Sequence, residues 1–362
     1  MRVDRLWLTD FRNYETAELA LAPGLTLVQG RNGQGKTNLL EAIAYLATLE
    51  SFRGTPIDAL VRSGAERAVV RAEAMRADRA LLIEAEIAPA GRSRVQFNRQ
   101  PLRRARDLLG ALRVTVFSPD DLVLVKGGPG ERRRYLDDTL VAVDARNDAR
   151  RRDVDRIIKQ RNALLKQAGG RLDPEVTATL DVWDSKLGTA GDGLGRARQA
   201  LVADLLPTLQ QAYDEVADEP SRVVARYEPA WLTDPGGLAA ALAAGRTDDV
   251  RRGVSLVGPH RDEVQVELDG RPARTHASQG EQRALSLALK LAAHQLVTVA
   301  AGAPPVLLLD DVFSELDPFR SAALVAHLPG GQTVLSSAGL LPPGAVPDEV
   351  LEVHAGSIRA RG

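Results

Sequence analysis

The stretch Gly30-Arg31-Asn32-Gly33-Gln34-Gly35-Lys36-Thr37 decides the fold of this chain. It satisfies the phosphate-binding loop pattern G-x-x-x-x-G-K-S/T. The apolar residues 25–28 before it predict a short buried strand, and residues 38–49 after it predict a helix with one apolar face. Strand, glycine-rich loop and helix in this order are the context in which the pattern binds nucleotide phosphates.

The residue types of this loop indicate its chemistry. Glycines let successive backbone N–H groups point at one anion, and the helix that follows adds its positive N-terminal end. All eight residues are therefore candidate nucleotide contacts. Lys36 is placed to reach the β- and γ-phosphates, and the Thr37 hydroxyl to ligate Mg²⁺. The alternative, a glycine-rich turn without function, does not explain the strand and helix around it.

A second apolar segment predicts the acidic part of the site. Residues 306–309 form a continuous apolar run, typical of a central parallel strand, and end at the acid pair Asp310-Asp311. In a phosphate-loop protein an acid at that position lies beside Mg²⁺. We expect Asp310 to hold the metal, mainly through water, and Asp311 to orient or deprotonate the attacking water. The alternative is a pair of carboxylates that only ends the strand at a turn.

The segment Ser278-Gln279-Gly280-Glu281-Gln282 opens a predicted helix over residues 281–301 that is apolar on most sides. Ser278 and Glu281 fit the capping box S-x-x-E. A serine hydroxyl, a glycine amide and a helix N-terminus also form an anion site. Both interpretations hold together. Because the phosphate loop already has its own helix, we expect Ser278, Gln279, Gly280 and Glu281 to contact the nucleotide of a second copy.

Composition limits the function classes. The 362 residues suggest two domains, and a net charge of -1 excludes a uniformly basic nucleic-acid binder. The absence of cysteine excludes disulfides and thiolate zinc sites. Residues 1–8 are too short and too charged for a signal peptide, and no stretch approaches the apolar run that spans a bilayer. We expect a cytoplasmic protein without a membrane partner.

The pattern along the chain predicts a discontinuous head and an insertion. Strands are expected at residues 2–8, 15–21, within 68–98 and at 114–117. After Gly127-Gly128-Pro129-Gly130 the chain reads as helices almost throughout to residue 242, with separate helices at 176–187 and 194–216. Strands return at 253–257 and 264–268. We predict an α/β head with a mixed sheet, formed by residues 1–126 and 250–362, and an inserted, mainly α-helical arm at 127–249.

Several basic residues have two open interpretations. The arm carries a set of cations that suits DNA phosphates, namely Arg132, Arg133, Arg134, Arg150, Arg151, Arg152, Arg156, Lys159 and Arg161. Aspartates are interspersed with them, so an ion-paired, solvated helix face is equally consistent. Arg12 and Asn13 either contact the adenine or ribose or form a polar turn.

These motifs in this order resemble the ATP-binding cassette superfamily. In that superfamily two heads enclose two ATP molecules, and each signature motif faces the partner's phosphate loop. The resemblance implies ATP and Mg²⁺ as cofactors and a homodimer with ATP. The signature here is SQGEQ instead of LSGGQ, the acid pair is Asp-Asp instead of Asp-Glu, and Ser336-Ser337 stand where a switch histidine is common. No glutamine loop can be assigned.

Within the superfamily the chain resembles the RecF family of bacterial recombination and repair proteins. The matching segments are residues 119–129, the following Arg132 to Asp137, residues 308–324, the triplet Ser51-Phe52-Arg53 and residues 258–262. The resemblance implies an ATP-dependent dimer on single-stranded and duplex or gapped DNA. It also implies RecA loading with RecO and RecR, replication restart and the SOS response.

The shorter acid at position 311 favours a slow, Mg-dependent ATPase that acts as a switch. Two other functions remain as alternatives. A nucleotide-binding subunit of an ABC transporter does not explain the arginine-rich arm. A chromosome-organising head requires arms far longer than this insertion forms at ~1.5 Å per helical residue.

Overall fold

The structure is a computed structural model that describes residues 1–361. The chain divides into two units. The first unit contains Met1–Asp121, Ala212–Pro220 and Arg283–Gly362, and the second contains Leu122–Gln211 and Ser221–Gln282. The boundaries of these units differ from the predicted domain boundaries at residues 126 and 249, which stay predictions.

An antiparallel sheet forms one layer of the first unit, in the strand order β2-β1-β4-β5-β6-β7. Its strands are β1 (Arg2–Phe11), β2 (Tyr14–Ala20), β4 (Ala68–Arg76), β5 (Arg79–Ile87), β6 (Arg94–Phe97) and β7 (Gln100–Pro101). Alternate residues of β4 and β5 are buried, as expected for a sheet with one face in the core. The predicted strands in this part of the sequence are confirmed.

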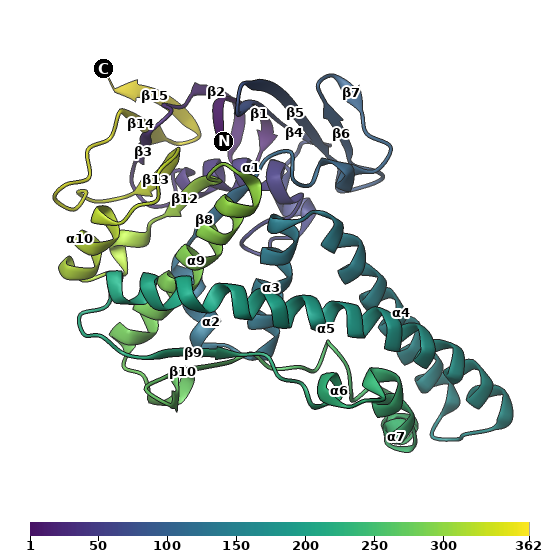
Figure 1. Ribbon diagram of the computed structural model, residues 1–362. Helices are drawn as coiled ribbons and strands as arrows, with labels where there is room; N and C mark the ends of the chain where they lie inside the picture. The colour runs from purple at the N-terminus through teal and green to yellow at the C-terminus, as the bar shows by residue number, and fades with distance from the viewer. Residues whose placement is uncertain (362) are drawn as a thin grey trace. The chain divides into compact units, whose positions relative to one another are not determined.

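A mixed sheet forms the second layer, in the order β15-β14-β3-β13-β12-β8. Its strands are β3 (Leu25–Gln29), β8 (Val114–Phe117), β12 (Val306–Asp310), β13 (Thr333–Ser337), β14 (Glu349–His354) and β15 (Ser357–Arg361). All neighbours are parallel except β14 and β15. Figure 1 shows the yellow C-terminal strands beside the purple β3. The predicted mixed sheet is therefore present, and β14 and β15 were not predicted.

Helix α1 (Lys36–Thr48) packs between the two sheets, in contact with β12 and β13 of one and with β4 and β5 of the other. Its buried residues share one hydrophobic core with both sheets. The unit also contains α10 (Pro318–Ala326) and the short 3₁₀ helices η1 (Ile57–Leu60), η2 (Ala105–Leu108) and η4 (Val312–Ser314). The helix that follows the phosphate loop is thus anchored in the hydrophobic core that the two sheets share.

Helix α9 (Gln279–Ala301) corrects one expectation from the sequence. It is long and apolar enough to cross a membrane by length and composition, although 61% of its apolar window is buried inside the protein. Ser286 Oγ donates to Asp121 O at 2.8 Å, and His294 Nδ1 lies 2.9 Å from Thr115 Oγ1. These polar contacts and the burial are typical of a core helix of a soluble protein.

The second unit is mainly helical, with one small sheet. It contains α2 (Val123–Lys126), α3 (Pro129–Val143), α4 (Arg146–Ala168), α5 (Pro174–Val216, which ends in the first unit), α6 (Ala230–Thr233), α7 (Gly237–Arg252) and α8 (Ala273–His276). The sheet has the order β11-β10-β9, with β9 (Val223–Arg226), β10 (Gln265–Leu268) and β11 (Arg271–Pro272). Strand β9 interrupts the region that the sequence predicts to be helical almost throughout. The short 3₁₀ helix η3 (Pro119–Leu122) crosses the boundary between the units.

Two further predictions for this unit were wrong. Residues 174–216 form one helix, because the glycines in its middle allow close packing and do not end the helix. A Cβ on Gly191 would lie 2.3 Å from Leu238 Cδ2, and a Cβ on Gly195 would lie 2.4 Å from the Trp231 ring. Residues 253–257 form no strand, because side chains satisfy the backbone. Asn162 Oδ1 accepts from the N–H of Ser255 at 2.8 Å.

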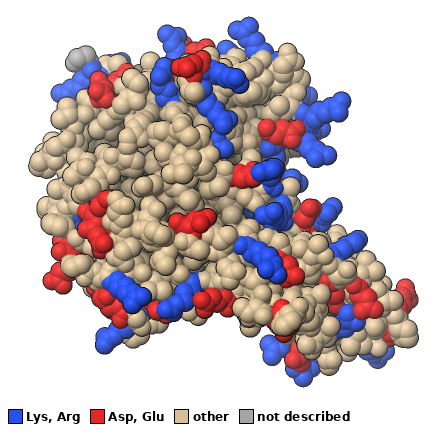
Figure 2. Space-filling model, in the orientation of Figure 1, with Lys and Arg blue, Asp and Glu red and all other residues tan. Residues whose placement is uncertain are grey.

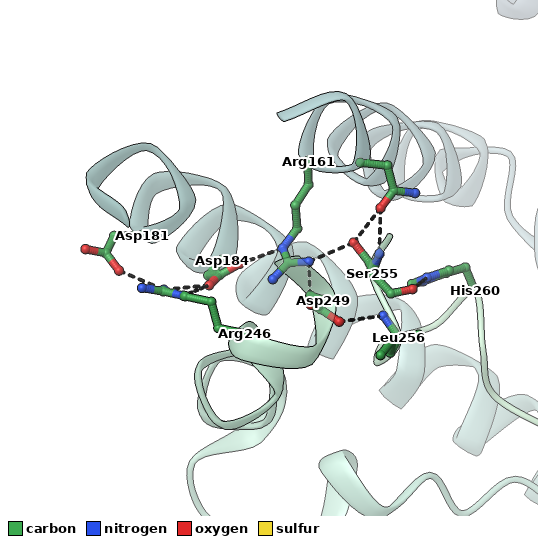
Figure 3. A network of polar contacts seen from close by, with 9 residues as sticks. Arg161, Asp181, Asp184, Arg246, Asp249, Ser255, Leu256 and His260 are labelled. Atoms are coloured by element: carbon green, nitrogen blue, oxygen red, sulfur yellow. Dashed lines mark hydrogen bonds and ion pairs between the residues drawn. The ribbon is translucent and has the colours of Figure 1, made fainter. Parts of the chain in front are cut away.

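Arg161, one of the residues considered as a DNA contact, lies in a buried network of hydrogen bonds and ion pairs (Figure 3). Arg161 is fully buried. Its Nε donates to Asp184 at 2.7 Å, and its Nη1 donates to Asp249 at 2.6 Å and to Ser255 Oγ at 2.8 Å. Arg246 donates to the same Asp184 at 2.7 Å. Arg161 therefore holds helices of the second unit together, so neither open interpretation applies to it: it is ion-paired, but it lies on neither a DNA-contacting nor a solvated face.

Most other cations of the predicted arm set are also bonded within the unit. Arg132 donates to both carboxylate oxygens of Glu263, at 2.9 and 3.1 Å. Arg151 pairs with Asp138 at 2.8 Å, and Arg156 pairs with Asp153 at 2.9 Å. For these residues the structure supports the ion-paired interpretation.

Candidate active site

The phosphate loop joins β3 to α1. Gly35 has a φ of 116°, and a Cβ there would lie 2.6 Å from Asn13 Nδ2 and 3.0 Å from the Tyr14 hydroxyl. Only glycine fits this position without displacing both side chains. No side chain within residues 1–361 caps the N-terminus of α1. The first N–H groups of the helix are therefore available to an anion.

Lys36 holds its ammonium group against the loop. Its Nζ donates to Gly30 O at 2.8 Å, to Arg31 O at 3.1 Å and to Asn32 Oδ1 at 3.4 Å. Burial lowers the pKa of Lys36, whereas the nearby acid pair opposes that shift. The cation thus lies at the loop and within electrostatic range of the acid pair, and its contact with the β- and γ-phosphates stays a prediction.

A chain of hydrogen bonds connects the loop to the acid pair. Thr37 Oγ1 donates to Asp310 Oδ1 at 2.8 Å. Ser336 Oγ donates to the same oxygen at 2.7 Å and accepts from the N–H of Asp311 at 3.0 Å. Parallel pairing of β12 with β13 puts Asp310 opposite Ser336. Asp311 itself follows the strand in the left-handed region, with a φ of 48°.

The donors beside the loop fit a magnesium ion. The hydroxyl of Thr37 and the carboxylate of Asp310 are hard oxygen ligands that lie next to each other, and Mg²⁺ prefers one or two such ligands together with water and phosphate. Burial raises the pKa of Asp310, and the hydrogen bonds from Ser336 and Thr37 and the charge of Arg53 oppose this shift. A bound cation favours the ionised carboxylate further.

Two turns hold the loop from outside. Asn13 Nδ2 donates to Gln34 O at 2.9 Å. In the turn between β14 and β15, the N–H of Ala355 donates to Gln34 Oε1 at 2.7 Å, and that of Gly356 donates to Gln34 O at 3.3 Å. The Gln34 side chain is therefore engaged by the protein, which leaves its backbone N–H for the predicted phosphate contact.

Arg12 and Asn13 lie in a polar turn, and their contact with the adenine or ribose stays a prediction. Arg12 donates to both oxygens of the fully buried Glu41, at 2.6 and 2.8 Å, and to Thr55 Oγ1 at 2.7 Å. Ser51 Oγ donates to Glu41 as well. These bonds join the β1–β2 turn to α1 and to the segment that follows it, so Arg12 positions the loop helix.

The predicted signature lies in the second unit, whereas the phosphate loop lies in the first. The N–H of Ser278 donates to Glu281 Oε2 at 2.6 Å, and the N–H of Glu281 donates to Ser278 Oγ at 3.3 Å. This reciprocal pair is the capping box that the sequence predicted. The structure thus brings together Lys36, Thr37 and the acid pair, and the contact of Ser278 to Glu281 with a nucleotide stays a prediction.

Two residues of the site were missed as functional candidates. Ser336 was noted only as standing where a histidine is common, yet its hydroxyl bonds to both members of the acid pair. Arg53 was noted only as part of a family motif, yet its positive charge opposes the rise in the pKa of Asp310 that burial causes. A serine one residue before the end of a strand carries no sequence signal of its own. The role of Ser336 follows only from the pairing of β13 with the neighbouring strand β12, which ends at Asp310.

Comparison with known proteins identifies the family. Residues 2–333 match the family described as RecF/RecN/SMC N terminal domain. The chain is 45% identical to the DNA replication and repair protein RecF of Kineococcus radiotolerans, over 97% of this chain and 94% of that protein. It is 44% identical to RecF of Streptomyces avermitilis, over 99% of this chain and 97% of that protein. The chain belongs to the RecF family.

Solved structures agree with this membership. The recombination mediator protein RecF-ATPrS in the RecFOR pathway is 27% identical, with a TM-score of 0.91 over 99% of this chain and 98% of that one. The Smc head domain from Pyrococcus furiosus, bound to the C-terminal domain of ScpA, is 15% identical, with a TM-score of 0.59 over 100% and 96%. The second likeness concerns the fold alone. The ABC-type ATPase head predicted from the sequence is therefore confirmed for this RecF-family chain.

Replacing Ser336 with alanine is expected to slow ATP hydrolysis about tenfold and to leave ATP affinity nearly unchanged. A hydrogen bond to a charged group contributes ~1.5–3 kcal/mol, and its loss here leaves Asp310 and the Asp311 N–H without their shared partner. Steady-state ATPase rates and equilibrium ATP binding measure the two effects. Ser337→Ala is the matched control, because Ser337 Oγ bonds to Gly339 O instead. If the two variants hydrolyse ATP at equal rates, the Ser336 hydroxyl has no role in the active site.

Proposed function

We propose that this RecF-family chain is a slow ATPase that dimerises on ATP and clamps DNA at gaps and single-strand/duplex junctions. The observation that carries the proposal is the bonded set of Thr37, Asp310, Ser336 and Asp311 beside an uncapped phosphate-loop helix. A RecF-ATP structure in the RecFOR pathway, 28% identical with a TM-score of 0.91 over 100% of this chain, supports ATP as the ligand.

The residues of the loop and the acid pair have different roles in ATP binding and hydrolysis. Loop N–H groups and Lys36 bind the β- and γ-phosphates. Thr37 and Asp310 would hold Mg²⁺, which neutralises charge on the phosphate oxygens. Asp311 orients the attacking water or takes its proton. Aspartate is one methylene shorter than glutamate, so slow turnover is expected, and a slow step suits a switch that stays closed on DNA.

The proposed dimerisation is based on two separate motifs, the phosphate loop and the segment that begins at Ser278, which would each supply part of the ATP site. The phosphate loop supplies one set of donors, and the capped helix start at Ser278 and Gly280 supplies another. We propose that Ser278, Gln279, Gly280 and Glu281 of one copy close over the γ-phosphate bound by the other. Residues 1–126 and 250–362 act as the ATPase head in this proposal, and residues 127–249 as an arm.

The family supports a cellular role in recombinational repair. Relatives carry the name DNA replication and repair protein, and two similar solved structures are described as RecF in the RecFOR pathway. We propose that this chain supports RecA loading with RecO and RecR in the cytoplasm, and through it replication restart and SOS induction. A transporter subunit is not favoured, because these relatives are repair proteins.

A binding titration tests the proposed function. Fluorescently labelled single-stranded, duplex and gapped DNA of equal length are titrated with the full chain, with ATP and without, across a salt series. We expect ATP to tighten binding to gapped DNA at least about tenfold and affinity to fall steeply with salt. Equal DNA affinity with and without ATP would contradict the proposed ATP-dependent clamp. Co-purification with a membrane chain and no DNA binding would instead support the transporter function.

A further inference from the structure

An arginine-rich segment lies at the edge of the antiparallel sheet, outside the arm. Between Glu86 and Asp107 the chain has no acidic residue. We call the following five residues the arginine patch: Arg92, Arg94, Arg99, Arg103 and Arg104. The segment runs through β6, the β6–β7 turn and the start of η2. Such a concentration of charge is unusual in a chain whose net charge is -1.

The side chains of the patch are exposed and largely unpaired. All five residues are exposed. Among residues 1–361, the guanidinium groups of Arg94, Arg99, Arg103 and Arg104 have no hydrogen-bond or ion-pair partner. Figure 2 shows Lys and Arg side chains gathered at the upper right, over the side of the sheet that holds these strands. Surface arginines with partners, as in the arm, are already neutralised, whereas these remain available to an anion.

The sheet holds the patch in a defined geometry. Val95 is buried, so its neighbours Arg94 and Gln96 lie on the opposite, outer face. The β6–β7 turn places Asn98 and Arg99 in the left-handed region, with φ angles of 50° and 66°. Asn98 Oδ1 accepts from the N–H of Leu82 at 2.8 Å, which fixes the turn to β5. Arg94 and Arg99 therefore project from a strand and from a turn that is bonded to the sheet, and Arg92, Arg103 and Arg104 lie in the segments that flank them.

The outer face is hollowed at two places, and patch residues line both hollows. Arg99 lines one hollow together with Arg71 and Gln96, and the acidic Glu84 lines it as well. Arg92 and Arg94 line the other, where Glu86 is paired with Arg67 at 3.3 Å. Arg94 and Arg99 thus line different hollows, so the patch offers more than one place for a phosphate.

We infer that the arginine patch binds the phosphate backbone of duplex DNA. The inference rests on the proposed DNA-binding function and assigns that function to the sheet edge of the first unit. Guanidinium groups bind phosphates without reading base sequence, which suits a protein that recognises a DNA structure. Several unpaired cations on one rigid edge give the local basic surface that a chain of near-zero net charge requires.

A charge-removal series tests this assignment. The patch variant carries Arg94→Gln, Arg99→Gln, Arg103→Gln and Arg104→Gln. The matched control removes the same charge from exposed positions of the second unit, through Arg146→Gln, Arg171→Gln, Arg251→Gln and Arg252→Gln. Binding to a labelled duplex with a single-stranded extension is measured with ATP between about 50 and 200 mM salt.

The two variants are expected to behave differently. The patch variant loses at least about tenfold in affinity at the lowest salt, and its log–log salt slope falls by about 0.9 for each lost phosphate contact. The control keeps the wild-type slope, and both variants keep wild-type ATP affinity. Equal binding by the wild type and the patch variant would overturn the assignment while DNA binding itself stands. No DNA binding by the wild type would overturn both.

Discussion

Replacing Lys36 with methionine is expected to weaken ATP binding at least about 100-fold and to abolish ATP-driven dimerisation. The two side chains have similar length, so the change removes the charge while it keeps most of the packing. The ammonium group already donates to Gly30 O and Arg31 O, and a phosphate would take the same donors. Two charge-assisted bonds at ~1.5–3 kcal/mol each correspond to a factor of 100 or more.

Equilibrium dialysis with ATP and sedimentation velocity with and without ATP measure the two expected losses. Lys159→Met is the matched control, because Lys159 is an exposed lysine on α4. It should dimerise with ATP as the wild type does. Thermal unfolding without nucleotide shows whether Lys36→Met is folded. A folded Lys36→Met chain that still forms a full ATP-dependent dimer would falsify the proposed role of ATP in closing the interface.

The parts of the site that sequence could predict are those encoded in consecutive residues. The phosphate loop needs only its own eight residues, the strand before it and the helix after it. Asp310 and Asp311 are found because an apolar run ends there. The capping box at Ser278 and Glu281 is equally local, and its two hydrogen bonds are present.

The parts that sequence could not predict depend on contacts between distant segments. Ser336 bonds to Asp310 because β12 and β13 pair in parallel with one particular register. Gln34 is held by Ala355, which is 321 residues away. No periodicity within either segment indicates the other. A sequence can therefore name the residues of the loop and the acid pair but cannot name the residues that position them.

The second unit shows the same limit for charged residues. Arg161 lies in a run of alternating charges that is typical of a solvated helix, yet it is fully buried. Its partners Asp184 and Asp249 are 23 and 88 residues away. A buried guanidinium is stable only when such partners surround it. Composition alone cannot distinguish that arrangement from an exposed basic face, because the residue types are the same.

Replacing Ser278 with aspartate is expected to leave ATP binding by the monomer unchanged and to prevent ATP-dependent dimerisation. Aspartate caps a helix N-terminus as well as serine does, so the fold of α9 is kept. In the proposed dimer the new carboxylate would face the γ-phosphate of the other copy. A like-charge contact across an interface costs several kcal/mol, or about 100-fold or more in dimer affinity.

The variant Ser278→Asn tests whether the charge of aspartate, and not its size or its capping ability, prevents dimerisation in Ser278→Asp. Asparagine has the shape of aspartate and the same capping ability, but no charge. We expect it to dimerise much better than Ser278→Asp when both are compared by sedimentation with ATP. Ser278→Arg removes the cap and adds bulk, so it should lose ~1 kcal/mol of stability and also fail to dimerise.

The ranking of these three variants decides between the two interpretations of the segment. If Ser278 acts only as a helix cap, aspartate and asparagine behave alike and both dimerise, while arginine alone is impaired through its lower stability. If Ser278 faces a phosphate of the other copy, aspartate fails despite an intact cap, and its failure has no counterpart in the thermal unfolding of the monomer. The observed capping box fits both interpretations, so only the charge at this position separates them.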